Sequence, residues 1–139
     1  LDLEGEPFGL GLIGSLENPC TLKDIAGRCR KELGLRSLRC WALPDRRFSR
    51  VALCGGSGGS LIEPAAAGGA ELFISGDFRY HDLKKAQAYG LGLIDAGHGG
   101  TEQPVVGYLA AYLISCLQEA GFKTAVAAAE TSPSEWLFY

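Results

Sequence analysis

The chain has 139 residues, of which 20 are glycine, two are histidine and none is methionine. Hydrophobic residues make up 47% of the sequence and the glycines follow no fixed period, which excludes collagen and low-complexity disorder. The net charge of −3 provides no basic field that would attract a phosphate backbone, so we expect no nucleic-acid partner. No apolar run approaches the ~20 residues of a membrane span, so we expect no membrane partner either.

The cysteines are odd in number, widely spaced and never arranged as C-x-x-C; they are Cys20, Cys29, Cys40, Cys54 and Cys116. This pattern is typical of reduced thiols and predicts a cytoplasmic protein. The length fits one domain over residues 1–139. Because the chain starts at Leu1 and lacks methionine, we expect it to be a fragment or a processed product of a longer protein.

The first third of the chain predicts a strand, a helix and a second strand. Residues 8–14 form a short apolar run broken by glycines, which indicates a weak strand. Thr21 is followed three residues later by Asp24, the pattern of a capped helix start, and Gly34 follows the apolar stripe as a stop. Apolar and polar residues alternate over 37–42, which predicts a half-exposed strand.

From residue 50 onward strands and helices alternate with short connections. The predicted strands are 51–54, 71–75, 91–95 and 122–128, and the predicted helices are 61–67, 82–89 and 104–120. Such alternation indicates an α/β fold with a largely parallel or mixed sheet and helices on both faces. Loops that follow parallel strands emerge at one edge of the sheet, where ligands bind. Both histidines, His81 and His98, fall in such loops.

The segment from Asp95 to Glu102 contains the residue types of a metal site. His98 and Glu102, with Asp95 before them, offer an imidazole and two carboxylates, which suit Zn, Mn, Fe or Ni depending on geometry. Thr101 is positioned to cap the helix that follows, with Glu102 near its N-terminus. The alternative is that Glu102 is only a first-turn helix acid and His98 only a loop histidine.

Asp77 and His81 repeat the same four-residue offset on the neighbouring loop. They can be additional ligands, or a catalytic acid/base pair in which Asp77 orients the imidazole of His81. Alternatively, Asp77 caps the helix that begins at His81.

The glycine-rich loop after Cys54 offers backbone N–H groups near a helix start. Gly56, Ser57 and Gly58 are therefore candidates for an anion-binding loop. The loop does not match G-x-G-x-x-G and no lysine follows it as in a P-loop. A tight turn between strand and helix explains the glycines equally well.

Three motifs occur in order at compatible spacings: Cys54-Gly-Gly-Ser-Gly-Gly-Ser60, Gly76-Asp77-x-x-Tyr80-His81, and Leu93-Ile94-Asp95-Ala96-Gly97-His98-x-x-Thr101-Glu102. Together they resemble the Ngg-interacting-factor-three family, whose bacterial members are often labelled GTP cyclohydrolase I type 2 homologues. The likeness runs from about Gly9 to the C-terminal Tyr139. It implies two divalent metal ions (Zn, Fe, Mn or Ni) per complete site in subunits that form a hexameric ring.

Carried over residue by residue, the family's C-terminal metal ligands match His98 and Glu102, while Asp77 and His81 match a motif that lines the same cavity. The family's other ligands include an adjacent histidine pair in an N-terminal half, and this sequence has no His-His dipeptide. The chain thus resembles the C-terminal half of such a protein, and we expect the N-terminal half to be its partner. We expect this chain alone to bind metal weakly or to bind a single ion.

Two functions follow as expectations. The first is a part of a dinuclear-metal hydrolase that acts on a nucleotide or another phosphate-bearing substrate, with His81 carrying a proton. The second is a non-catalytic module that binds a metal or an anion, or serves assembly, without turnover.

Overall fold

The computed structural model describes residues 9–43 and 45–129. The chain divides into two compact units, Leu1–Thr101 and Glu102–Tyr139. Over the described part of the chain, no helix is both long and apolar enough to cross a bilayer. All five cysteines are free thiols, as the sequence predicts.

The first unit is built on a five-stranded mixed sheet with the strand order β1-β3-β4-β5-β2. The central strands β3, β4 and β5 are parallel, and β1 and β2 pair antiparallel at the two edges. The strands are β1 (Leu12–Thr21), β2 (Arg39–Trp41), β3 (Arg47–Ser57), β4 (Leu72–Gly76) and β5 (Gly92–Asp95). The expected mixed sheet is thereby confirmed.

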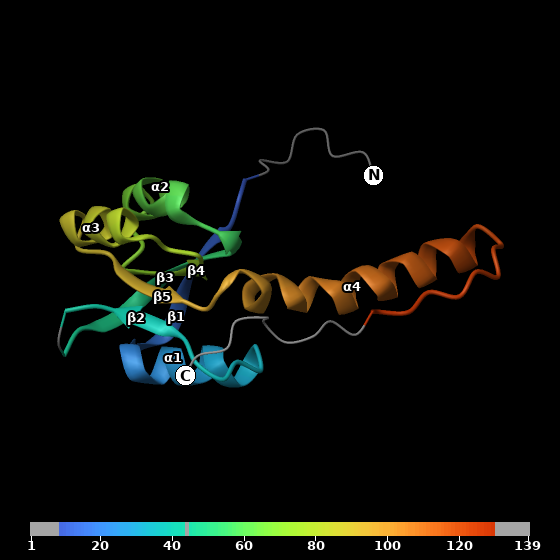
Figure 1. Ribbon diagram of the computed structural model, residues 1–139, viewed down its shortest axis with the longest axis horizontal. Coiled ribbons are helices and arrows are strands. Elements are labelled where there is room, and N and C mark those ends of the chain that lie inside the picture. Colours follow the sequence, from blue (N-terminus) through green and yellow to red (C-terminus); the bar gives the residue numbers. More distant parts are fainter. Residues whose placement is uncertain (1–8, 44, 130–139) are drawn as a thin grey trace. The chain divides into compact units, whose positions relative to one another are not determined.

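Helices cover both faces of this sheet (Figure 1). They are α1 (Leu22–Glu32), a 3-10 turn η1 (Gly59–Leu61), α2 (Ile62–Ala67) and α3 (Tyr80–Ala88). Side chains alternate between the two faces of β4, since Phe73 packs in one hydrophobic cluster with α2 and α3, whereas Leu72 and Ile74 pack in a second cluster with Ile25 of α1. The two-faced arrangement that the sequence predicts is therefore correct.

Helix α1 starts where the sequence predicts. The Thr21 hydroxyl accepts the backbone N–H of Asp24 at 3.2 Å, and the Asp24 carboxylate accepts the backbone N–H of Thr21 at 3.3 Å. Hydrogen bonds from Thr21 also lower the pKa of Asp24. Gly34, just beyond the helix, has a φ of +64°, a left-handed conformation that favours glycine.

Two predictions for the C-terminal third are wrong. The last helix, α4 (His98–Glu119), begins six residues before the predicted start at residue 104, and Pro104 lies inside it. Residues 122–129 contain no strand. The proline signal misplaced the helix start because proline commonly opens helices. The apolar residues after Gly121 looked like a strand, but a strand also needs a hydrogen-bonding neighbour, which composition does not reveal.

Glu71, just before β4, yields a pH-dependent prediction. Its Oε2 accepts the backbone N–H groups of Ser49 at 2.6 Å and Arg50 at 3.0 Å, and these bonds lower the pKa of Glu71 from its ordinary value of 4.5. Because the folded-state pKa is depressed, the ionised carboxylate stabilises the fold above the ordinary pKa, and this stabilisation is lost as the pH falls through the folded-state pKa. We expect Glu71→Gln to lower the melting temperature at neutral pH but much less at about pH 3.

Thermal unfolding of the wild type and the variant at both pH values checks this. A melting-temperature difference that is as large in acid as at neutral pH would contradict the role given to the Glu71 charge.

Candidate functional site

The loops that follow β4 and β5 meet at the carboxyl edge of the sheet. The two strands are parallel neighbours, with Ser75 opposite Asp95 in register. A Cβ added at Gly76 would lie 2.6 Å from the carbonyl carbon of Gly97 and 2.7 Å from the backbone nitrogen of His98. The two loops therefore touch backbone to backbone, which only glycine permits at position 76.

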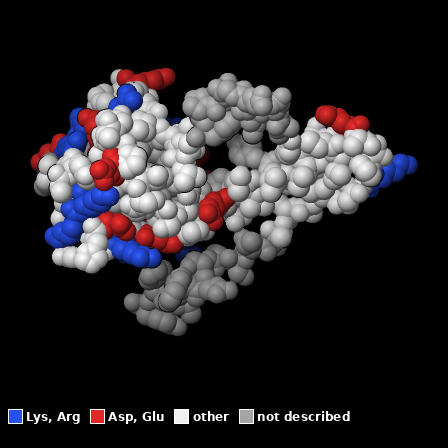
Figure 2. Space-filling view, turned by 90° about the horizontal axis from the view of Figure 1, so that it is seen from above, with Lys and Arg blue, Asp and Glu red and all other residues white. Residues whose placement is uncertain are grey.

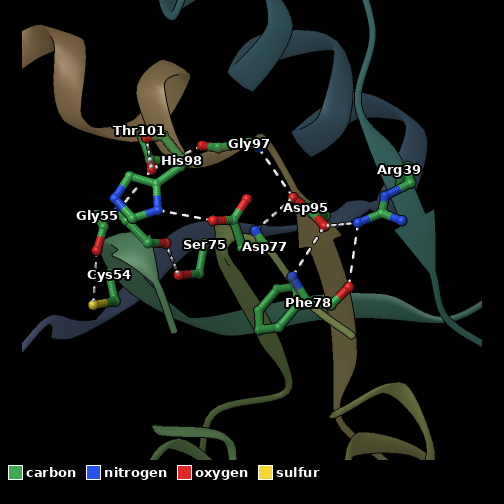
Figure 3. A network of polar contacts seen from close by, with 11 residues as sticks. Arg39, Cys54, Gly55, Ser75, Asp77, Phe78, Asp95, Gly97, His98 and Thr101 are labelled. Atoms are coloured by element: carbon green, nitrogen blue, oxygen red, sulfur yellow. Dashed lines mark hydrogen bonds and ion pairs between the residues drawn. The ribbon is translucent and has the colours of Figure 1, made fainter. Parts of the chain in front are cut away.

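A buried carboxylate joins these loops (Figure 3). Asp95, at the end of β5 and 8% exposed, accepts the backbone N–H groups of Asp77 and Phe78, both at 3.2 Å, and of Gly97 at 3.0 Å. It also forms an ion pair with Arg39 of β2. The oxygens of Asp95 are thus engaged by these donors, and Asp95 organises the two loops.

The Asp77 carboxylate contacts His98. Its Oδ2 lies 2.8 Å from Nδ1 of His98, and the two side chains are 54% and 49% exposed. Asp77 has a φ of +57°, a left-handed conformation that is uncommon for residues other than glycine. The imidazole that Asp77 contacts is thus that of His98, while the catalytic pairing of Asp77 with His81 stays a prediction.

His81 has a different environment. It lies in the first turn of α3, is exposed, and makes an edge contact with Tyr80 at 5.7 Å between ring centroids. The suggestion that Asp77 caps α3 is also wrong: the N-cap residue is Arg79, whose backbone N–H donates to the carboxylate of Asp82 at 2.8 Å.

The glycine-rich loop is used internally. The N–H of Gly56 donates to the Thr101 hydroxyl at 2.9 Å, and the N–H of Gly58 donates to the Gly76 carbonyl at 3.4 Å. A Cβ at Gly58 would lie 2.8 Å from Cζ of Phe73. Two of the three N–H groups of Gly56, Ser57 and Gly58 thus have protein acceptors and close packing accounts for Gly58, while an anion-binding role for the loop stays a prediction.

Thr101 and Glu102 lie inside α4. The Thr101 hydroxyl is within hydrogen-bonding distance of the carbonyls of Gly97 (3.0 Å) and His98 (2.8 Å), so it anchors the first helical turn, and its predicted role as N-cap is wrong. Glu102 is four residues after His98 along α4.

The candidate metal ligands are His98 and Glu102. Among residues 9–43 and 45–129, no group of three or more His, Cys, Asp or Glu side chains is arranged to hold a metal ion. His98 and Glu102 together offer one imidazole nitrogen and one carboxylate, a donor pair suited to Zn, Mn, Fe or Ni. These donor types suit such an ion, but two ligands are too few to complete its coordination shell.

Sequence reasoning missed the organising role of Arg39 and Asp95. The position of Asp95 at the end of a buried strand was a usable signal, since a carboxylate there faces the N–H groups of neighbouring loops. Arg39 carries no comparable signal. Its contact with Asp95 exists only because β2 pairs with β5, and the two residues are 56 positions apart in the sequence.

Comparison with known proteins shows the family of the chain. The family model described as Duf34/NIF3 (NGG1p interacting factor 3) matches residues 2–134. Proteins named "GTP cyclohydrolase 1 type 2 homolog" are similar to the chain: the one from Clostridium acetobutylicum is 30% identical over 94% of this chain and 48% of its own length, and the one from Streptomyces coelicolor is 32% identical over 92% of this chain and 46% of its own length.

Among solved structures, a Bacillus cereus protein related to NIF3 superposes with a TM-score of 0.91 at 28% identity, covering 100% of this chain and 38% of that protein. The chain thus spans about half or less of the length of these relatives. With the family model matching nearly the whole sequence, and with the fold in agreement, the chain belongs to the Duf34/NIF3 family.

Proposed function

We propose that this chain contributes two metal ligands, His98 and Glu102, to the dinuclear centre of a hydrolase that acts on a nucleotide or another phosphate-bearing substrate. The observation that carries the proposal is the arrangement at the carboxyl edge, where the His98 imidazole is held by the Asp77 carboxylate and Glu102 follows one helical turn later. The remaining ligands would come from an N-terminal half, which fits the share of the relatives' length that the chain spans.

The residues of this chain have distinct tasks in such a reaction. His98 would supply a ring nitrogen and Glu102 a carboxylate to such ions. When bound, a divalent ion supplies Lewis acidity and activates water for hydrolysis. His81, exposed at the start of α3, is the side chain that takes up and releases a proton.

The first test is metal binding by the full 139-residue chain. We expect Zn²⁺ titrated into the wild type in a calorimeter to bind at one site, and we expect the His98→Ala/Glu102→Ala variant to lose this binding, because both donors are gone. The control is Glu32→Ala, which removes an exposed carboxylate of α1 that has no part in the proposed reaction and is expected to bind Zn²⁺ as the wild type does. Equal Zn²⁺ affinity in the wild type and the His98/Glu102 variant would sink the proposal, provided circular dichroism shows both to be folded.

A second candidate function, assembly, is favoured by the second unit. Along α4 large hydrophobic side chains are exposed, among them Val105 at 59%, Tyr108 at 79% and Leu109 at 52%, and no α4 residue is buried. Most of the α4 surface visible in Figure 2 is uncharged. Exposed apolar surface of this kind marks association sites, so we propose that further copies of the chain cover α4 in a homo-oligomer, such as the hexameric ring that the resemblance implies.

The two functions are distinguished by turnover. The hydrolase predicts metal-dependent hydrolysis of a nucleotide or phosphate ester by the protein with both halves, whereas a pure assembly module predicts none. Sedimentation of the same samples reports association independently of metal and turnover.

A further inference from the structure

Asp77 lies in the loop between β4 and α3, and neither this loop nor the start of α3 explains the contact that its carboxylate makes. Its carboxylate neither caps α3, where Asp82 serves, nor contacts the next histidine along the chain. Instead it reaches 21 residues along the sequence to Nδ1 of His98. We propose that Asp77 is a positioning residue that fixes His98 in the tautomer with hydrogen on Nδ1 and thereby makes Nε2 the nitrogen that a metal binds.

The chemistry of the pair sets the tautomer. An ionised carboxylate accepts hydrogen bonds and cannot donate one, so at 2.8 Å from Oδ2 the Nδ1 atom of His98 carries the hydrogen. In a neutral imidazole the lone pair for coordination then lies on Nε2. A carboxylate behind a metal-binding histidine also fixes the ring orientation and raises the basicity of the ligand.

Both members of the pair are anchored to one buried group. The backbone N–H of Asp77 and that of Gly97, the residue before His98, donate to the same Oδ1 atom of Asp95 at 3.2 and 3.0 Å. The close approach at Gly76 holds the two loops together beside this anchor. The separation between Asp77 and His98 is therefore set by the sheet edge and by Asp95, even though the two side chains are half-exposed.

The backbone of Asp77 bears on the role of its carboxylate. A φ of +57° is a strained conformation for aspartate, and a half-exposed ion pair contributes little to stability. Stability alone would be served as well by glycine at this position. The contact with His98 is therefore the reason for an aspartate at position 77, because stability does not require one.

The decisive experiment reads the tautomer directly and needs no metal. The chain has only two histidines, so a two-bond ¹H–¹⁵N spectrum contains two imidazole systems, and His81→Gln assigns them. At mildly alkaline pH we expect His98 to be the Nδ1–H form in the wild type and to shift mainly to the Nε2–H form in Asp77→Gly. Glycine is the chosen replacement because it accepts a positive φ, so that the backbone is not disturbed.

A matched control removes the same residue type from the same backbone conformation. Asp45 is the other residue besides the glycines with a positive φ, +56°, among those described, and it is exposed. Asp45→Gly is expected to leave the His98 tautomer unchanged. The proposal is overturned if wild-type His98 is mainly Nε2–H, or if Asp77→Gly leaves its tautomer as in the wild type.

Zn²⁺ then tests the part of the inference that rests on the proposed function. We expect the ¹⁵N signal of His98 Nε2, and not of Nδ1, to move on addition of Zn²⁺, and Asp77→Gly to weaken Zn²⁺ binding about 10–100-fold while Asp45→Gly does not. Coordination through Nδ1, or equal Zn²⁺ affinity in both variants, would contradict the positioning role. If the wild type binds no Zn²⁺ while the tautomer shifts as expected, the metal proposal fails and the control of His98 by Asp77 stands.

Discussion

Replacing Asp95 with alanine is expected to destabilise the protein by about 3 kcal/mol, because three backbone N–H groups lose an ionised acceptor in a buried or partly buried position. The donors belong to Asp77, Phe78 and Gly97, which lie in the two loops that form the candidate site. Urea denaturation followed by circular dichroism measures the loss as a shift of the midpoint.

Arg39→Ala is the control for this experiment. It removes the ion-pair partner of Asp95, but the Arg39 side chain is 75% exposed, so we expect a loss below about 1 kcal/mol. If the two variants were destabilised equally, the ion pair and not the backbone acceptor would be the stabilising interaction. We also expect Asp95→Ala to release His98 from the Nδ1–H tautomer, since the backbone that positions Asp77 is no longer held.

Gly76→Ala carries the second large effect. Its methyl group would lie within 2.8 Å of three backbone atoms of Gly97 and His98, and a backbone, unlike the end of a flexible side chain, cannot turn away. We expect a loss of stability of about 1–3 kcal/mol, together with weakened Zn²⁺ binding, because the loops must separate to admit the methyl group.

The matched control for Gly76→Ala is Gly27→Ala in α1. A Cβ at Gly27 meets nothing within 4 Å, and alanine is the better helix former, so this variant should be more stable by about 0.5–1 kcal/mol. If stability falls in Gly76→Ala but rises in Gly27→Ala, the loss at position 76 comes from close packing and not from a general effect of replacing glycine with alanine. A Gly76→Ala variant as stable as the wild type would show that the loops have room to move apart.

The features that the sequence predicted well depend on neighbours along the chain. Thr21 and Asp24 form their capping box within one turn, and the apolar runs of β4 and β5 become the buried centre of the sheet. The alternation of strands and helices was enough to predict parallel pairing and hence which loops share an edge. Both histidines lie in those loops or in the helical turns that follow them.

The details of the site depend on register, which a single sequence does not contain. A local interpretation pairs Asp77 with His81, four residues away, whereas the pairing of β4 with β5 brings it to His98. In the same way the sequence does not reveal the acceptors of the Gly56 and Gly58 N–H groups, because these acceptors, Thr101 and the Gly76 carbonyl, lie on other elements.

The left-handed backbone of Asp77 has an evolutionary consequence. Glycine suits a φ of +57° better than aspartate does, so a library of variants at this position that is selected only for resistance to heat or proteolysis should enrich glycine. The selected glycine variant would fold at least as well as the wild type, but it would lack the carboxylate that orients His98. Position 77 is thus a place where folding stability and chemistry favour different amino acids.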